Sequence, residues 1–83
     1  MFLHITKARY IEDHKIYFEF NNGEKGIVDF KGVLKGKVFE PHKDINFFKN
    51  FILNPPTIEW SNHTDLAPEF ILELVKKESE YAL

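Results

Sequence analysis

Cysteine is absent from the 83-residue sequence, which excludes a disulfide framework, a thiolate metal site and a cysteine nucleophile. Glycine and proline are scarce, with four of each. Charge of one sign does not dominate, because eleven Lys and Arg stand against thirteen Asp and Glu, for a formal net charge of −2. Domains dedicated to nucleic acid are usually strongly basic, so nucleic acid is an unexpected partner. The length allows one small domain over residues 1–83.

Long apolar runs are missing as well. No stretch approaches the ~20 residues of a membrane span, and the N-terminal residues do not resemble a signal peptide. We therefore expect a cytoplasmic location and no membrane contact. Aromatic residues, in contrast, are abundant, with nine Phe, three Tyr and one Trp. A chain of this size hides only about 60 to 65% of its unfolded surface, so this apolar content favours self-association or a protein partner.

Alternating apolar and polar residues predict a β-hairpin near the N-terminus. Residues 16–20 and 24–30 each place every second side chain on an apolar face, and Asn21-Asn22-Gly23 between them is a turn sequence. Residues 2–11 are rich in β-branched and aromatic side chains and predict a preceding strand. Because two strands alone are marginally stable in water, we expect a three-stranded antiparallel meander.

The centre of the chain predicts one short helix. Two glycines in residues 31–41 allow no more than a turn near Val33 and Leu34, followed by a loop. Asp44 is a suitable N-cap for a helix over residues 45–51, which we expect to end at Asn54-Pro55-Pro56. The helix would carry three phenylalanines, namely Phe47, Phe48 and Phe51.

The C-terminal part predicts a strand, a polar turn and a helix. Residues 57–60 fit a fourth strand with Ile58 and Trp60 facing inward, and residues 61–65 are polar. Pro68 opens the last helix, whose apolar stripe comprises Phe70, Ile71, Leu74 and Val75. The predicted fold class is α+β: a three-stranded antiparallel meander, a short helix, a fourth strand and a C-terminal helix packed on one sheet face.

The order of these features is similar to that of a known family. Trp60 to Pro68, with the sequence WSNHTDLAP, is the most specific match, and it is accompanied by Asn22-Gly23-Glu24, Asp29, Phe39 and Phe47. On these residues the chain resembles the bacterial family catalogued as domain of unknown function 2442. The resemblance implies a small α+β domain without an assigned activity, from small two-gene loci for which an antitoxin-like role has been suggested. Ala67 departs from the hydroxyl residue frequent in the family, so Thr64 or Asp65 would have to cap the last helix.

The turn after Trp60 is the best candidate for a functional surface. Trp60, Asn62, His63 and Asp65 would bring an indole, an amide, an imidazole and a carboxylate together. The alternative is structural, because Trp60 would then be core, Asn62 and Asp65 would bond within their own turn, and His63 would be solvated.

Two further features are candidates for binding. The lysine run Lys31, Lys35, Lys37 and Lys43 could hold a phosphate or an acidic partner, with Lys35 and Lys37 at its centre, or could be a solvated loop. In the short helix, Phe47 and Phe48 diverge by about 100°, so one ring needs a cover from a loop or from a partner. We take Phe48 as the candidate partner anchor.

Chemical motifs are lacking elsewhere. The four histidines, His4, His14, His42 and His63, are too widely spaced for a local metal site. No nucleophile elbow or phosphate-binding glycine loop occurs, so we expect no catalytic residue, no metal and no cofactor. Two functions remain open. The first is a non-enzymatic protein-interaction module of a small bacterial locus, antitoxin-like or accessory. The second is a small-ligand or nucleic-acid-binding module that uses the Trp60 to Asp65 turn and the Lys31 to Lys43 loop.

Overall fold

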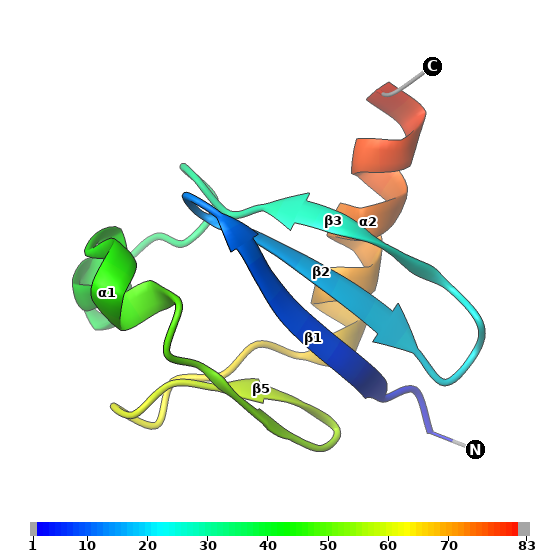
Figure 1. Ribbon diagram of the computed structural model, residues 1–83, viewed down its shortest axis with the longest axis horizontal. Coiled ribbons are helices and arrows are strands. Elements are labelled where there is room, and N and C mark those ends of the chain that lie inside the picture. The colour runs from blue at the N-terminus through cyan, green and yellow to red at the C-terminus, as the bar shows by residue number, and fades with distance from the viewer. Residues whose placement is uncertain (1, 82–83) are drawn as a thin grey trace.

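The computed structural model describes the backbone of residues 2–81 and the side chains of residues 2–78. Its N-terminal part is an antiparallel sheet of three strands in chain order, β1 (Ile5–Glu12), β2 (Lys15–Phe20) and β3 (Lys25–Asp29) (Figure 1). The turn between β2 and β3 places Gly23 at φ 88°, a conformation that glycine adopts without steric cost. The predicted meander is confirmed.

The inner face of this sheet carries the larger part of the core. Ile16 lies opposite Val28 and Phe18 lies opposite Gly26, and the side chains of Ile16, Phe18 and Val28 are fully buried. The outer face carries polar and charged residues in the same register, with Arg9 opposite Tyr17. One-sided burial of this kind is what an alternating sequence specifies.

Helix α2 (Pro68–Tyr81) covers the inner face, behind the sheet in Figure 1. A Cβ atom built on Gly26 would lie only 2.8 Å from Cγ1 of Val75, so the helix approaches β3 where a side chain is missing. The prediction of a C-terminal helix packed on one sheet face is therefore confirmed. Ile71 and Val75 are buried, whereas Phe70 is exposed, which corrects its assignment to the apolar stripe. Because successive residues of an α-helix are rotated by about 100°, Phe70 points away from the side of the helix on which Ile71 packs against the sheet.

The segment between β3 and the second sheet contains two short helices. A 3-10 helix, η1 (Lys37–Lys43), replaces the loop that the sequence predicted. Helix α1 (Ile45–Phe48) follows, with Asp44 as N-cap accepting a hydrogen bond from the backbone of Asn46 at 3.0 Å. The cap is as predicted, but the helix ends at Phe48 instead of continuing to residue 51.

The second sheet is a hairpin of β4 (Ile52–Asn54) and β5 (Thr57–Glu59). The sequence assigned Pro55 and Pro56 to the end of a helix, and this is wrong, because they form the hairpin turn. Periodicity could not separate the two cases, since a short apolar run suits either a helix or a strand. The strand predicted at residues 57–60 does form, and its hydrogen-bonded neighbour is β4.

Trp60 joins the two sheets. Its indole N–H donates to the backbone carbonyl of Phe48 at 2.8 Å, and the two rings lie 5.8 Å apart. Phe48 in turn lies 5.9 Å from Phe30, at the end of the meander. All three side chains are buried. Within residues 2–81, no helix is both long and apolar enough to cross a membrane.

Candidate functional site

The Trp60 to Asp65 turn is closed by its own backbone and by one amide side chain. The Trp60 N–H donates to the carbonyl of Thr64, and the His63 N–H donates to the carbonyl of Trp60. The Asn62 side-chain oxygen accepts from the Thr64 backbone at 3.3 Å and from the Thr64 hydroxyl at 2.7 Å. This is the turn chemistry that asparagine favours. It places His63 at φ 67°, which is unusual for a residue with a side chain.

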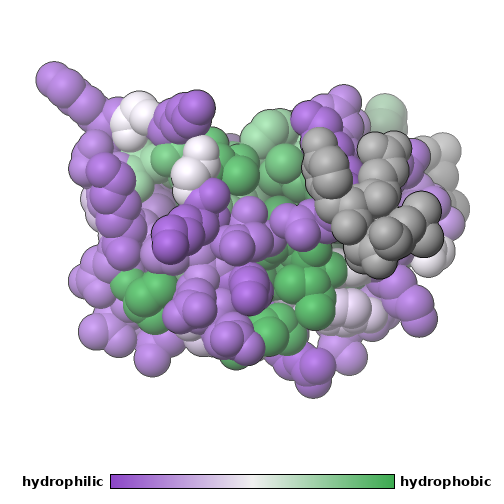
Figure 2. Space-filling view, turned by 90° about the horizontal axis from the view of Figure 1, so that it is seen from above, coloured by the Kyte–Doolittle hydropathy of each residue, from purple (hydrophilic) through white to green (hydrophobic). Residues whose placement is uncertain are grey.

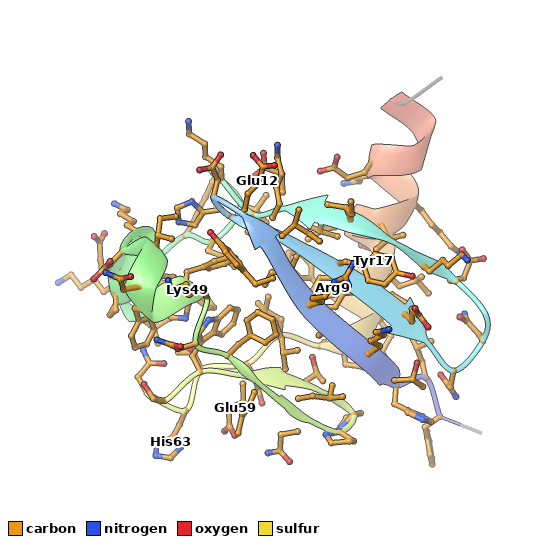
Figure 3. The ribbon with its side chains drawn as sticks, viewed as in Figure 1. Arg9, Glu12, Tyr17, Lys49, Glu59 and His63 are labelled. Carbon is orange, nitrogen blue, oxygen red and sulfur yellow. The ribbon has the colours of Figure 1, made fainter. Side chains whose placement is uncertain are left out.

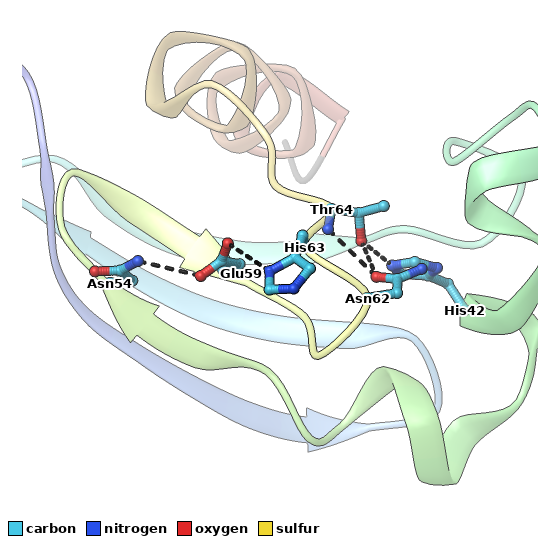
Figure 4. A network of polar contacts seen from close by, with 6 residues as sticks. All are labelled: His42, Asn54, Glu59, Asn62, His63 and Thr64. Carbon is cyan, nitrogen blue, oxygen red and sulfur yellow. Dashed lines mark hydrogen bonds and ion pairs between the residues drawn. The ribbon is translucent and has the colours of Figure 1, made fainter.

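His42, on η1, connects this turn to the lysine segment (Figure 4). Its Nε2 lies 2.9 Å from the hydroxyl of Thr64. The Asn62 side-chain nitrogen reaches the Val38 carbonyl at 3.4 Å, and the His14 Nε2 donates to the backbone carbonyl of His42 at 2.9 Å. Three separate parts of the chain therefore meet at one histidine.

The hydrogen bonds assign the protons along this chain of groups. Because Asn62 donates through its nitrogen to a carbonyl, its oxygen is the acceptor for the Thr64 hydroxyl. The Thr64 oxygen then accepts from His42, so Nε2 of His42 carries a proton. In a neutral ring the other nitrogen, Nδ1, is an acceptor, and among the residues that the structure describes it has no hydrogen-bond partner.

Aromatic rings surround His42. The rings of Phe39, Phe47 and Trp60 lie 5.0, 4.9 and 4.5 Å from it, each roughly edge-on. Only 1% of the histidine is exposed. Burial lowers the pKa of His42 below its ordinary value, and the Phe39 carbonyl nearby opposes the shift more weakly. His42 is therefore neutral at pH 7.

The sequence did not single out His42, and no local signal marks it. A histidine between Pro41 and Lys43 in a polar stretch looks solvated. It is buried only because rings from α1 and from the end of β5 close around it.

Two of the predicted binding residues lie in the core. Phe48 and Trp60 are buried, so neither ring is available as a surface anchor in this conformation. The choice of Phe48 as the partner anchor is corrected: it is the ring that faces inward, and its neighbour Phe47 is the half-buried one, lying against His42. The core alternative that the sequence left open for Trp60 describes the structure.

The remaining turn residues divide between turn structure and solvent. Asn62 bonds within the turn, and Asp65 is exposed and pairs through its backbone with Glu59. Neither Thr64 nor Asp65 is seen to cap α2 within residues 2–78. The Thr64 hydroxyl is occupied by Asn62 and His42, and the first α2 bonds end on the carbonyl of Ala67.

Glu59 and His63 lie next to one another on the side of the β4–β5 hairpin that faces away from the β1–β3 sheet (Figures 3 and 4). Glu59 accepts a hydrogen bond from the Asn54 side chain at 3.1 Å, and its other oxygen lies 3.9 Å from Nδ1 of His63. The His63 side chain is 91% exposed. These two residues border a hollow of about 230 Å³ that Ile52, Trp60 and others also line.

Strand β4 was the second feature that the sequence missed. Ile52 and Leu53 are 60% and 40% exposed, although both are large and apolar. Two apolar residues followed by Asn-Pro-Pro are a weak strand signal, and the helix predicted just before them obscured it.

The lysine run lies on the surface. Lys35 precedes η1, Lys37 begins it, and both are exposed. Lys43 pairs with Glu40 at 3.2 Å in an exposed contact.

Figure 2 shows one face of the molecule, on which hydrophilic residues surround smaller hydrophobic patches. Among the described residues no group of three or more His, Asp and Glu side chains is placed to hold a metal ion.

Comparisons with known proteins add one finding. No curated protein and no solved structure matches the chain significantly. A family model described as "Protein of unknown function (DUF2442)" matches residues 5–77. That range runs from the first residue of β1 into α2 and includes both sheets and the His42 connection. The chain therefore belongs to this family, as its resemblance predicted.

Proposed function

We propose that the chain is a non-enzymatic protein-interaction module that binds a partner chain or a second copy through β4. The contact surface consists of Ile52 and Leu53 with the neighbouring Glu59 and His63, and we call it the hairpin surface. The observation that carries the proposal is the exposure of two large apolar residues on a strand paired along one edge.

An exposed strand edge is a template for another strand. Within residues 2–81, β4 is hydrogen-bonded to β5 alone, so its outer edge offers free backbone donors and acceptors. Because successive residues of a strand face opposite sides, Ile52 and Leu53 expose apolar surface on both faces of the hairpin. A strand added at β4 would satisfy the edge and cover both side chains, which is the mode known as β-augmentation.

The biological setting in this proposal comes from the family resemblance. We place the module in a small bacterial locus, in an antitoxin-like or accessory role, and in the cytoplasm. Identification of the neighbouring gene tests this setting directly, because a toxin-like neighbour would supply the partner.

The hairpin surface is tested with two matched lysine substitutions. Ile52→Lys places a charge on β4, whereas Ile27→Lys places the same charge on β3, where the parent residue is 45% exposed. Both sites are on the surface, so each change should alter the free energy of unfolding by no more than about 0.5 kcal/mol.

Sedimentation velocity over a wide concentration range measures self-association of each variant, and co-purification with the product of the neighbouring gene measures hetero-association. We expect Ile52→Lys to abolish the association that the parent chain shows and Ile27→Lys to retain it. Equal behaviour of the two variants, or a parent chain that associates in neither assay, would contradict the proposal.

A further inference from the structure

A second hollow lies away from the hairpin surface, where the β1–β2 turn, the segment after β3 and η1 come together. Its volume is about 280 Å³. Phe30, Leu34 and Phe39 supply the apolar part of its lining. Phe30 is buried and the other two are half-buried, so the rings and the branched side chain are held by the core. A preformed apolar pocket of this size suits a small planar molecule.

His42 also lines this pocket. Its Nε2 is committed to Thr64, which leaves Nδ1 as a buried acceptor without a hydrogen-bond partner. A buried polar atom without a partner costs free energy, so a donor that reached Nδ1 would be bound favourably. A ligand for this pocket therefore gains from an O–H or N–H group at one end.

Positive charge borders the same pocket. Lys31 and Lys43 are among its lining residues. Residues 31–43 contain four lysines and a single acidic residue, Glu40, so the local potential favours an anion. Two of the four exposed lysines, Lys31 and Lys43, thus border the pocket, and Lys43 is also paired with Glu40.

We propose that this pocket binds a small aromatic carboxylate that carries a phenolic or indole hydrogen-bond donor. The ring lies against Phe30 and Leu34, the carboxylate faces Lys31, and the donor bonds to Nδ1 of His42. Because Nδ1 has no exposed surface, a donor reaches it only if a neighbouring side chain moves, and Phe39 is the neighbouring ring that also lines the pocket.

The probe for this site is 4-hydroxyphenylacetate, titrated into ¹⁵N-labelled protein and followed by NMR. We expect saturable shifts at residues 31–34 and 39–43, including Phe39. The ¹⁵N resonance of His42 Nδ1 reports separately whether its lone pair accepts a hydrogen bond. Shifts that do not saturate, or that spread over the surface, would overturn the proposal.

Two analogues separate the contributions of charge and donor. Tyramine keeps the ring and the phenol but replaces the carboxylate by an ammonium group, and it should bind at least about tenfold more weakly, a loss of about 1.4 kcal/mol. Phenylacetate lacks only the donor and should bind more weakly without moving the Nδ1 resonance. Equal affinity for all three molecules would show a non-selective apolar hollow and refute the assignment.

Two variants test the location of the site. Lys31→Glu should weaken binding about tenfold through reversed charge, whereas Lys25→Glu, the same change at an exposed lysine of β3, serves as its control. Leu34→Trp should fill the pocket and abolish binding while far-ultraviolet circular dichroism stays that of the parent. Unchanged binding by Leu34→Trp would place the ligand elsewhere. These measurements are independent of the hairpin surface, so either proposal can fail alone.

Discussion

The two sheets of this protein bury their residues differently. In the β1–β3 sheet the inner face is covered by α2, and the apolar residues of β2, Ile16, Phe18 and Phe20, are all buried. In the β4–β5 sheet, β5 is largely buried, but β4 exposes both of its apolar residues. The first sheet thus buries one whole face, as in an ordinary small domain. In the second sheet β5 is largely buried and β4 is exposed to solvent.

The difference indicates which part of the molecule supplies most of the folding free energy and which part has apolar surface available to a partner. Burial of apolar surface is the main source of folding free energy, so the meander and α2 supply most of it. Strand β4 contributes little burial of its own, and its exposed side chains remain available to a partner.

The largest effect is expected at the connection between the sheets. Trp60→Ala removes a buried ring and the hydrogen bond to the Phe48 carbonyl, and it should lower the free energy of unfolding by about 3 to 5 kcal/mol. Urea denaturation followed by circular dichroism measures this loss. Trp60→Phe, which keeps a ring but not the donor, should lose less. An unchanged midpoint for Trp60→Ala would mean that the sheets do not depend on this contact.

The contact between β3 and α2 should be next in size. Gly26→Ala places a methyl group 2.8 Å from Val75 and should cost about 1 to 3 kcal/mol through overpacking. Val75→Ala makes room for this methyl group, so the double variant should be less destabilised than the sum of the single variants. Strictly additive effects in a double-mutant cycle would contradict the close approach of helix and strand.

The His42 connection predicts a pH dependence of stability. Burial lowers the pKa of His42 in the folded chain, so the unfolded chain takes up the proton first as the pH falls. Its contribution is complete above the ordinary histidine pKa of about 6.5 and is lost as the pH falls from there toward the lower folded-state value. Free energies of unfolding measured at several pH values between about 5 and 8 follow this change.

A non-titrating substitute provides the comparison. His42→Gln retains a donor for Thr64, and it should flatten this part of the pH profile. His63→Gln makes the same substitution at a histidine whose side chain is 91% exposed, and it serves as the matched control. The same slope in His42→Gln and in the parent chain would refute the role assigned to His42.

The smallest effect concerns the backbone of the Trp60 to Asp65 turn. His63 has φ 67°, a conformation that costs a residue with a side chain about 1 kcal/mol. His63→Gly should therefore be neutral or slightly stabilising, and His63→Ala should be less stable than His63→Gly by a similar amount. Thermal denaturation of the two variants measures the difference, and equal midpoints would show that the turn relaxes.

The sequence predicted those elements that are specified locally. The meander follows from alternation in residues 16–20 and 24–30, the α1 cap from Asp44, and the start of α2 from Pro68. The failures have a common cause, because η1 and β4 are too short to show a period. Strand β4 forms a local hairpin with β5, but its Pro55-Pro56 turn resembles a helix end in the sequence. Helix η1 depends on distant residues, because it is bonded through His42 to His14 and Thr64.

The candidate site was predicted in part for the same reason. The structural alternative for this turn, drawn from residue type, describes the Asn62 bonds within the turn and the exposure of the His63 side chain, and the binding role of both residues stays a prediction. The burial of Phe48 and His42 depends on which rings meet in three dimensions, and helical spacing alone could not choose between Phe47 and Phe48.

The bonds at His42 also constrain the order in which the chain folds. Helix η1 has no side-chain N-cap and contains Pro41, so it has little stability alone. The bonds of His42 run to His14, 28 residues earlier, and to Thr64, 22 residues later, and the Val38 carbonyl accepts a further bond from Asn62. Closing both loops costs entropy that is recovered only after the flanking turns exist. We therefore expect η1 to form late in folding and its side of the pocket to become ordered after both sheets have assembled.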